Sequence, residues 1–163
     1  MAITIKATVG AVDANSFATV AEADAYLDTL YGADEWGSAS ADDKARLLIT
    51  ATNQIVKMPI VYDKLAESQA LAFPVNNTSI DKETEGDGFF EAKEACIVQA
   101  FFLFLSNDTI REAINAGIQG IKSEGLSSIS KTVSGYNPYR KYHPDVLKLL
   151  VNFVDFSVKT SRY

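Results

Sequence analysis

The residues best suited to binding chemistry lie in one short segment near the C-terminal end, Tyr136–Tyr142, with the sequence YNPYRKY. Three tyrosines, one arginine and one lysine among seven residues are unusual for a loop. Tyrosine and arginine are favoured at protein-interface hot spots, and tyrosines beside cations also stack on the bases of single strands. This Tyr/Arg/Lys loop is therefore open to three interpretations: an ordinary exposed turn, a protein-contact surface, or a single-stranded nucleic-acid site.

The chain lacks the residues of a catalytic or metal centre. His143, the single histidine, precedes Pro144 at an expected helix start, where a capping or surface role is expected. Cys96, the single cysteine, lies in an apolar run and is expected to be an inert core thiol. The acids of residues 81–87 lack the spacing of a calcium loop and are expected to be solvated. The sequence predicts no enzyme activity, no metal and no cofactor.

The composition is that of an ordinary globular protein, with 47% hydrophobic and 22% charged residues over 163 positions. The net charge of −6 argues against a protein whose main task is gripping nucleic-acid phosphates, although a local basic patch is compatible with it. One cysteine cannot form an intramolecular disulfide, which favours a reducing compartment. The N-terminal residues do not read as a signal peptide, so we expect a protein that is soluble inside a cell.

One stretch, Phe89–Leu105, organises the expected fold. From Ala95 to Leu105 every residue except Gln99 is apolar. A helix that is apolar nearly all round belongs in the centre of a core, and the run is about half as long as a membrane span requires. Gln99 is then expected to need an internal hydrogen-bond partner.

Further helices are expected around this central one. Thr19 and Glu22 form a capping-box pattern at the start of a helix over Thr19–Tyr31. Ser40 is expected to cap a second helix that runs to about Met58. Another helix is expected to begin at Asn107, and the last at Pro144. The predicted fold is mostly α, a small bundle of four to five helices around the central apolar helix.

Extended segments complete the predicted architecture. Alternating residues with β-branched side chains predict one short strand or β-arm near residues 127–134. Its partner is expected to be the N-terminal segment, another copy or another protein. We expect a single domain over residues 1–163, with extended arms at 1–16 and 122–142 and a short tail at 157–163.

Several motifs, taken in order, resemble a known family. Residues 14–27 read ANSFATVAEADAYL, Trp36 follows in a turn, and residues 48–52 read LITAT. Residues 69–74 then read QALAFP, and residues 121–130 read IKSEGLSSIS. This order resembles the head–tail connector family of tailed bacteriophages, also called adaptor or head-completion proteins. Val75 departs from it, because arginine is usual there, and so does the acidic insert at residues 80–88.

The resemblance implies a structural protein of the virion neck that is assembled in the host cytoplasm. Copies of the chain, typically twelve, would form a ring bound to the portal protein and to a stopper or tail-side neck protein. Double-stranded DNA would pass through the ring without sequence-specific contact, and no membrane would be involved.

The same interpretation assigns candidate surfaces. The expected subunit or portal interface comprises Lys122, Ser128, Ile129, Lys131, Val133, Tyr136, Tyr139, Arg140, Lys141, Tyr142, Lys159, Arg162 and Tyr163. Acids expected at the lumen or at an exposed rim are Asp81, Glu83, Glu85 and Asp87.

An alternative function follows from the same resemblance. Some members of this group are labelled as similar to a primosomal single-stranded-DNA-binding protein. The alternative is therefore an accessory protein that binds single-stranded nucleic acid through Tyr136, Tyr139, Arg140, Lys141 and Tyr142.

Overall fold

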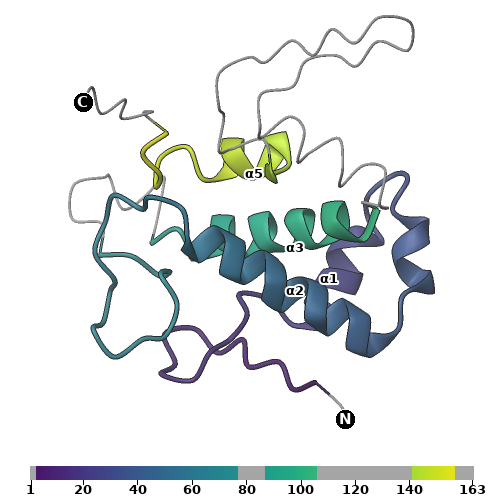
Figure 1. Cartoon of the computed structure of the whole chain (residues 1–163), viewed down its shortest axis with the longest axis horizontal. Coiled ribbons are helices and arrows are strands. Elements are labelled where there is room, and N and C mark those ends of the chain that lie inside the picture. Colours follow the sequence, from purple (N-terminus) through teal and green to yellow (C-terminus); the bar gives the residue numbers. More distant parts are fainter. Residues whose placement is uncertain (1–2, 77–86, 106–140, 157–163) are drawn as a thin grey trace, which may run out of the picture.

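The part of the chain that the structure describes is mostly α-helical. A computed structural model describes residues 3–76, 87–105 and 141–156. These ranges contain four α-helices and one 3₁₀ helix: α1 (Val20–Leu27), η1 (Asp34–Ser38), α2 (Ala41–Val56), α3 (Phe89–Leu105) and α5 (Pro144–Leu149) (Figure 1). Within the same ranges there are isolated bridges but no strand. The prediction of a mostly α fold is confirmed, while the predicted strand near 127–134, the helix from Asn107 and the tail at 157–163 lie outside the described residues.

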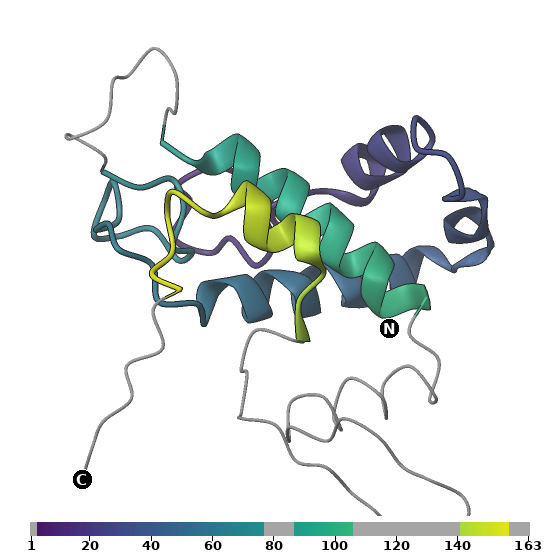
Figure 2. The same ribbon diagram turned by 90° about the horizontal axis from the view of Figure 1, so that it is seen from above.

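Helix α3 lies between α2 and α5 and makes most of its contacts with these two helices (Figures 1 and 2). Its bounds are those predicted from the apolar run. Ala92, Ala95 and Ala100 are fully buried, and such small side chains let the neighbouring helices approach closely. Leu48 and Ile55 of α2 are also fully buried, and each contributes about 1.5–3 kcal/mol to folding. The central position predicted for this helix is confirmed.

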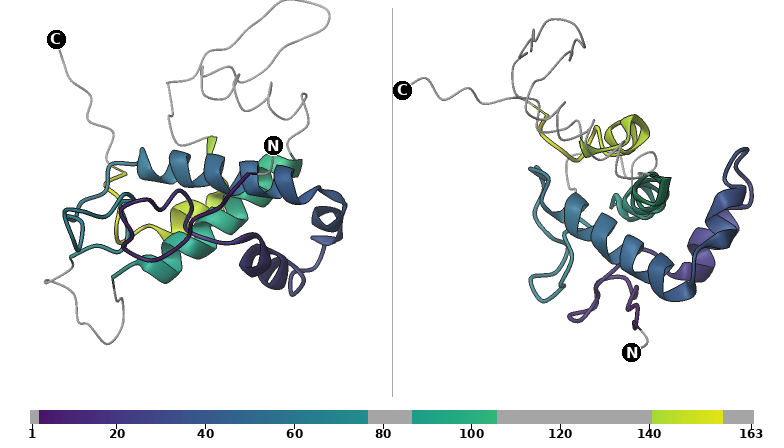
Figure 3. Two further views of the ribbon diagram at one scale, coloured as in Figure 1. Left: turned by 90° about the horizontal axis from the view of Figure 1, so that it is seen from below. Right: turned by 45° about the vertical axis from the view of Figure 1, so that its right-hand side comes forward.

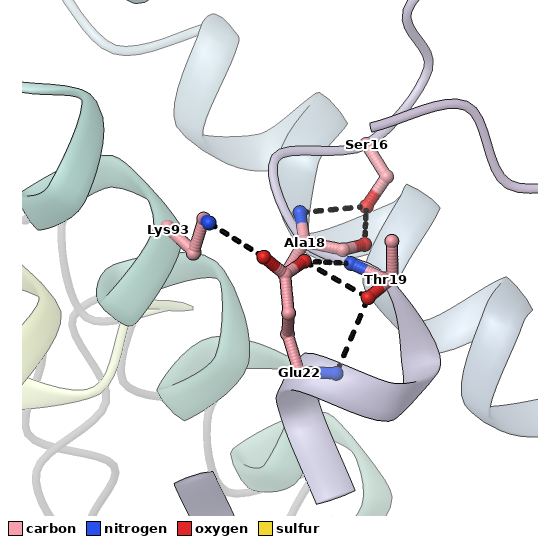
Figure 4. Close-up of polar contacts among 5 residues, drawn as sticks. All are labelled: Ser16, Ala18, Thr19, Glu22 and Lys93. Atoms are coloured by element: carbon pink, nitrogen blue, oxygen red, sulfur yellow. Dashed lines mark hydrogen bonds and ion pairs between the residues drawn. The ribbon is translucent and has the colours of Figure 1, made fainter. Parts of the chain in front are cut away.

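The predicted capping box at the start of α1 is present (Figure 4). Thr19 Oγ1 accepts a hydrogen bond from Glu22 N at 3.2 Å, and Glu22 Oε2 accepts one from Thr19 N at 2.8 Å. The other carboxylate oxygen of Glu22 accepts from Lys93 Nζ of α3 at 2.6 Å. Just before the cap, Ser16 Oγ donates to Ala18 O at 2.7 Å. One carboxylate thus closes the helix start and joins α1 to the central helix.

Two helices, α1 and α2, end earlier than predicted, because hydrogen bonds to the residue three back replace the α-helical pattern. In α1, Thr29 Oγ1 and Thr29 N both donate to Tyr26 O, and Gly32 follows with a φ of 83°. Helix α2 ends at Val56 rather than near Met58. Helix α5 ends at Leu149, although Leu150 and Phe153 beyond it are still buried.

The segment 57–76 contains turns but no helix. Gln69, which is 3% exposed, organises this segment. Its amide donates to Leu71 O and Pro74 O and accepts from Ala66 N. At the entrance to α3, Gly88 has a φ of 71°, and a Cβ there would lie 2.8 Å from rings on both sides. Only glycine fits that position.

The N-terminal segment is extended but not paired as a strand. Lys6 N donates to Asn15 Oδ1 at 2.8 Å, and Asn15 N donates to Lys6 O at 2.9 Å. These bonds close a loop that lies on the far side of α2 from α5 (Figure 3). The expected extended arm therefore folds back on its own chain.

Replacing Glu22 with alanine should lower the free energy of unfolding at pH 7 by about 1 kcal/mol, because the Thr19 amide loses its acceptor. The Glu22 side chain is 41% exposed, so its ion pair with Lys93 contributes little of that amount. Burial raises the pKa of the Glu22 carboxyl, but hydrogen bonds from Lys93 and Thr19 outweigh burial and hold the pKa below 4.5. The stabilisation is therefore complete above about pH 4.5 and is lost as the pH falls through the native pKa.

Denaturant unfolding at about pH 7 and about pH 3 measures both effects. The difference in stability between wild type and Glu22→Ala should shrink at the lower pH. Glu67→Ala is the control, because Glu67 is exposed in the segment 57–76. Equal losses for the two variants at pH 7 would show that the capping box does not stabilise the fold.

Candidate nucleic-acid interface

The C-terminal end of the Tyr/Arg/Lys loop is the part of the predicted site that the structure describes. It comprises Lys141 and Tyr142, followed by His143. Of the other candidate residues, Asp87 is described. Those outside the described residues are Asp81, Glu83, Glu85, Lys122, Ser128, Ile129, Lys131, Val133, Tyr136, Tyr139, Arg140, Lys159, Arg162 and Tyr163.

Gln99 of the central helix holds this end of the loop in place. Its side chain is fully buried, and each polar atom of its amide is hydrogen-bonded. Nε2 donates to Gln54 Oε1 at 2.7 Å and to Lys141 O at 3.1 Å. Oε1 accepts from His143 N at 3.0 Å. The expected internal partner of Gln99 exists, and the amide joins α2, α3 and the loop at one point.

Tyr142 is buried, with 5% of its surface exposed. Its hydroxyl donates to Gln54 O at 2.9 Å, a carbonyl in the last turn of α2 that also accepts from Lys57 N at 3.3 Å. The ring of Tyr142 is therefore not presented to solvent, which departs from its expected place in a contact surface. The physical reason is that this carbonyl of α2 accepts the hydroxyl inside the fold.

Lys141 lies at the surface end of this arrangement. Its ammonium is 5.0 Å from the centre of the Tyr142 ring, within the range of a cation–π contact. Five other described cations form ion pairs with carboxylates: Lys6 with Asp13, Lys44 with Asp24, Arg46 with Asp43, Lys93 with Glu22 and Lys148 with Asp145. Lys57 and Lys64, like Lys141, have no such pair among the described residues. No described carboxylate pairs with Lys141, so its charge remains available to an anion.

His143 starts α5 as its N-cap residue. Its Nδ1 accepts from Asp145 N at 3.2 Å, which confirms the predicted capping role. The imidazole also lies edge-on to Phe102 of α3, with 5.5 Å between the ring centres. Pro144 at the first helical position follows the predicted pattern.

An apolar groove of about 570 Å³ lies beside His143, between α1, α3 and α5. We call it the α1–α3–α5 groove. Its lining includes Tyr26 and Leu30 of α1, Phe101, Phe102 and Leu105 of α3, and His143. Asp145 and Lys148 form a polar edge, where Lys148 Nζ donates to Asp145 Oδ1 at 2.8 Å and lowers the pKa of the Asp145 carboxyl. Burial raises the pKa of the Tyr26 hydroxyl, and the charges of Glu94 and Asp145 raise it further.

Three other residues considered for chemistry have structural roles. Cys96 is fully buried, and burial raises the pKa of its thiol to about 11, so the predicted inert core cysteine is confirmed. Trp36, 2% exposed, donates through Nε1 to Asp24 Oδ1 at 2.8 Å. Asp87 Oδ1 accepts from Phe89 N at 3.1 Å at the start of α3. Among the described residues no group of histidines, cysteines and acids could hold a metal ion, and no helix is long and apolar enough to cross a membrane.

Sequence reasoning identified Gln99 but missed Gln54 as a site residue. Gln54 accepts from Gln99 through its side chain and from Tyr142 through its carbonyl. The one signal for Gln54 in the sequence is its place near the end of the helix that precedes Pro59, where backbone carbonyls accept from donors outside the helix.

The Gln99 amide is expected to decide the position of the loop end. Gln99→Leu should lower the free energy of unfolding by about 3 kcal/mol, because it leaves buried partners without hydrogen bonds. Hydrogen exchange at the His143 amide should then become fast, since that amide loses its acceptor.

Gln69→Leu is the matched control, since Gln69 is an equally buried glutamine in the segment 57–76. It should destabilise the fold similarly but leave the His143 amide protected. If the His143 amide exchanged equally fast in the two variants at matched stability, Gln99 would have no local role in holding the loop end.

The chain was compared with known proteins. One protein-family model matches residues 1–135, and its description reads "Putative DnaT-like ssDNA binding protein". No curated protein and no solved structure is significantly similar to the chain.

This match corrects the assignment to the bacteriophage head–tail connector family, which was wrong. The predictions that depended on this assignment are wrong as well: the structural role in the virion, the twelvefold ring, the portal and stopper partners, and the passage of double-stranded DNA through the ring. The motifs that suggested a connector lie almost wholly within the matched residues, so they belong to the matched family instead. The alternative, single-stranded nucleic-acid binding, agrees with the family description. Because the match covers residues 1–135 of a chain of 163, this protein belongs to the DnaT-like single-stranded-DNA-binding family.

Proposed function

We propose that this protein binds single-stranded DNA in a role related to DNA replication. The observation that carries the proposal is the family match over residues 1–135. The role is one of binding, with no reaction catalysed. A role at replicating DNA implies that the protein works in the cytoplasm.

We further propose that the Tyr/Arg/Lys loop supplies the main contact with the strand. The family match ends just before Tyr136, so support for this step comes from the chemistry of the loop itself. Lys141 offers a cation that no described carboxylate neutralises, and Arg140 precedes it in the sequence. Such cations contact phosphates, and the rings of Tyr136 and Tyr139 are of the kind that stacks on bases.

The hydrogen bonds of Gln99 support this assignment energetically. They fix the backbone on both sides of Tyr142, through Lys141 O and His143 N. A strand that binds there meets one end of the loop already ordered, so less conformational entropy is lost on binding. With a net charge of −6, the protein as a whole repels DNA. Binding is therefore local to this loop and indifferent to base sequence.

Titration of a fluorescent single-stranded oligonucleotide, followed by anisotropy, tests the proposal. The affinity should fall steeply with salt, with a slope of about −0.7 for each phosphate contacted. Lys141→Ala should weaken binding about three- to tenfold and reduce that slope by about 0.7. A duplex of the same length should bind more weakly, because its bases are not free to stack.

Lys6→Ala is the matched control, since it removes the same charge from the N-terminal segment, which lies on the far side of α2 from α5 (Figure 3). It should change the affinity little and leave the salt slope as in wild type. Absence of any binding at low salt would refute the proposed function. Equal effects of Lys6→Ala and Lys141→Ala would refute the loop as the contact.

A further inference from the structure

Resting on the proposed single-stranded-DNA binding, we propose that the α1–α3–α5 groove receives an unstacked base of the bound strand. The phosphates next to that base would be held at Lys141. The groove and Lys141 would then form one continuous site, in which Lys141 takes a phosphate and the groove takes a base.

The lining of the groove suits a base better than a phosphate. Tyr26, Phe101, Phe102 and His143 supply aromatic surface, and leucines fill much of the remainder. Bases stack on aromatic side chains whatever their identity. The charges at the edge are balanced, because Lys148 is paired with Asp145. A phosphate inside the groove would therefore gain no net attraction, whereas an uncharged base would bury its apolar faces.

The position of the groove connects it to the loop. His143 lines the groove, and its backbone amide is bonded to the same Gln99 amide that holds Lys141 O. Lys141 and His143 are two residues apart, immediately before α5 begins. One nucleotide can thus have its phosphate at Lys141 while its base reaches toward Phe102.

The groove is also open and large enough. Leu30 is 42% exposed and Leu105 is 37% exposed, although both are apolar and border the groove. Exposed apolar surface of this kind commonly marks a binding site. A volume of about 570 Å³ lies within the range of small-ligand pockets.

Paired oligonucleotides separate this inference from the proposed function. One carries normal bases, and the other has the same length and phosphates but abasic sugars at its central positions. Wild-type protein should bind the first about tenfold more tightly, since one stacked base contributes about 1–3 kcal/mol. Leu30→Gln should reduce this preference at least threefold, and Phe102→Leu should reduce it further. Both variants should keep the salt slope of wild type.

The matched control is Leu65→Gln, the same change at an exposed leucine in the segment 57–76. It should keep the full preference for normal bases. Cross-linking of wild-type protein to an oligonucleotide with 5-iodouracil gives a second measurement that needs no variant. Its cross-links should map to peptides of α1, α3 or α5, with Tyr26, Phe102 and His143 as expected sites.

The outcomes are distinguishable. If wild-type protein binds neither oligonucleotide, the proposed function and this inference both fail. If it binds, but Leu30→Gln and Leu65→Gln keep the same preference and cross-links map outside the three helices, only the groove assignment is overturned. Groove variants that lose stability but keep the full preference for normal bases would also overturn it. The groove residues would then serve packing within the protein and not the binding of DNA.

Discussion

The buried side-chain amide of Gln99 joins the central helix to α2 and to the residues that precede α5. Helix α3 is otherwise apolar through its second half, so a glutamine there would be costly without partners. Its hydrogen bonds to Gln54, Lys141 and His143 remove that cost. They also require α2 and the chain before α5 to meet at the same place. Tyr142 adds a second link to Gln54, so the start of α5 and the end of the Tyr/Arg/Lys loop depend on this polar contact.

This arrangement divides the protein into a stable frame and a contact surface. The frame consists of helices α1, α2 and α3, which are joined by buried side chains and by the Glu22–Lys93 contact. His143 lines the α1–α3–α5 groove where α5 begins, and Lys141 lies two residues before His143 in the chain. The same feature suits the proposed contact of an acidic protein with a polyanion: five described cations are paired with carboxylates, whereas Lys141 has no carboxylate partner among the described residues.

Local patterns predicted much of the frame. The bounds of α3, the Thr19–Glu22 box, Ser40 as a cap and His143–Pro144 as a helix start depend on near neighbours in the chain, and the structure has them all. The single polar residue in the apolar run, Gln99, predicted that buried hydrogen-bond partners exist. It did not predict which residues they are, since they lie more than 40 residues away in sequence. Tyr142 was expected at a surface because only tertiary packing brings Gln54 O to its hydroxyl. The family and the function were both misassigned, because short motifs that carry no chemical mechanism identify neither on their own.

Backbone amide shifts during an NMR titration with a single-stranded oligonucleotide test the central claim most directly. The account predicts saturable shifts at Lys141, His143 and Phe102, while Ala18 and Glu22, which do not line the groove, remain unchanged. Shifts confined to the N-terminal segment or to residues 57–76, or no shifts at low salt, would contradict it.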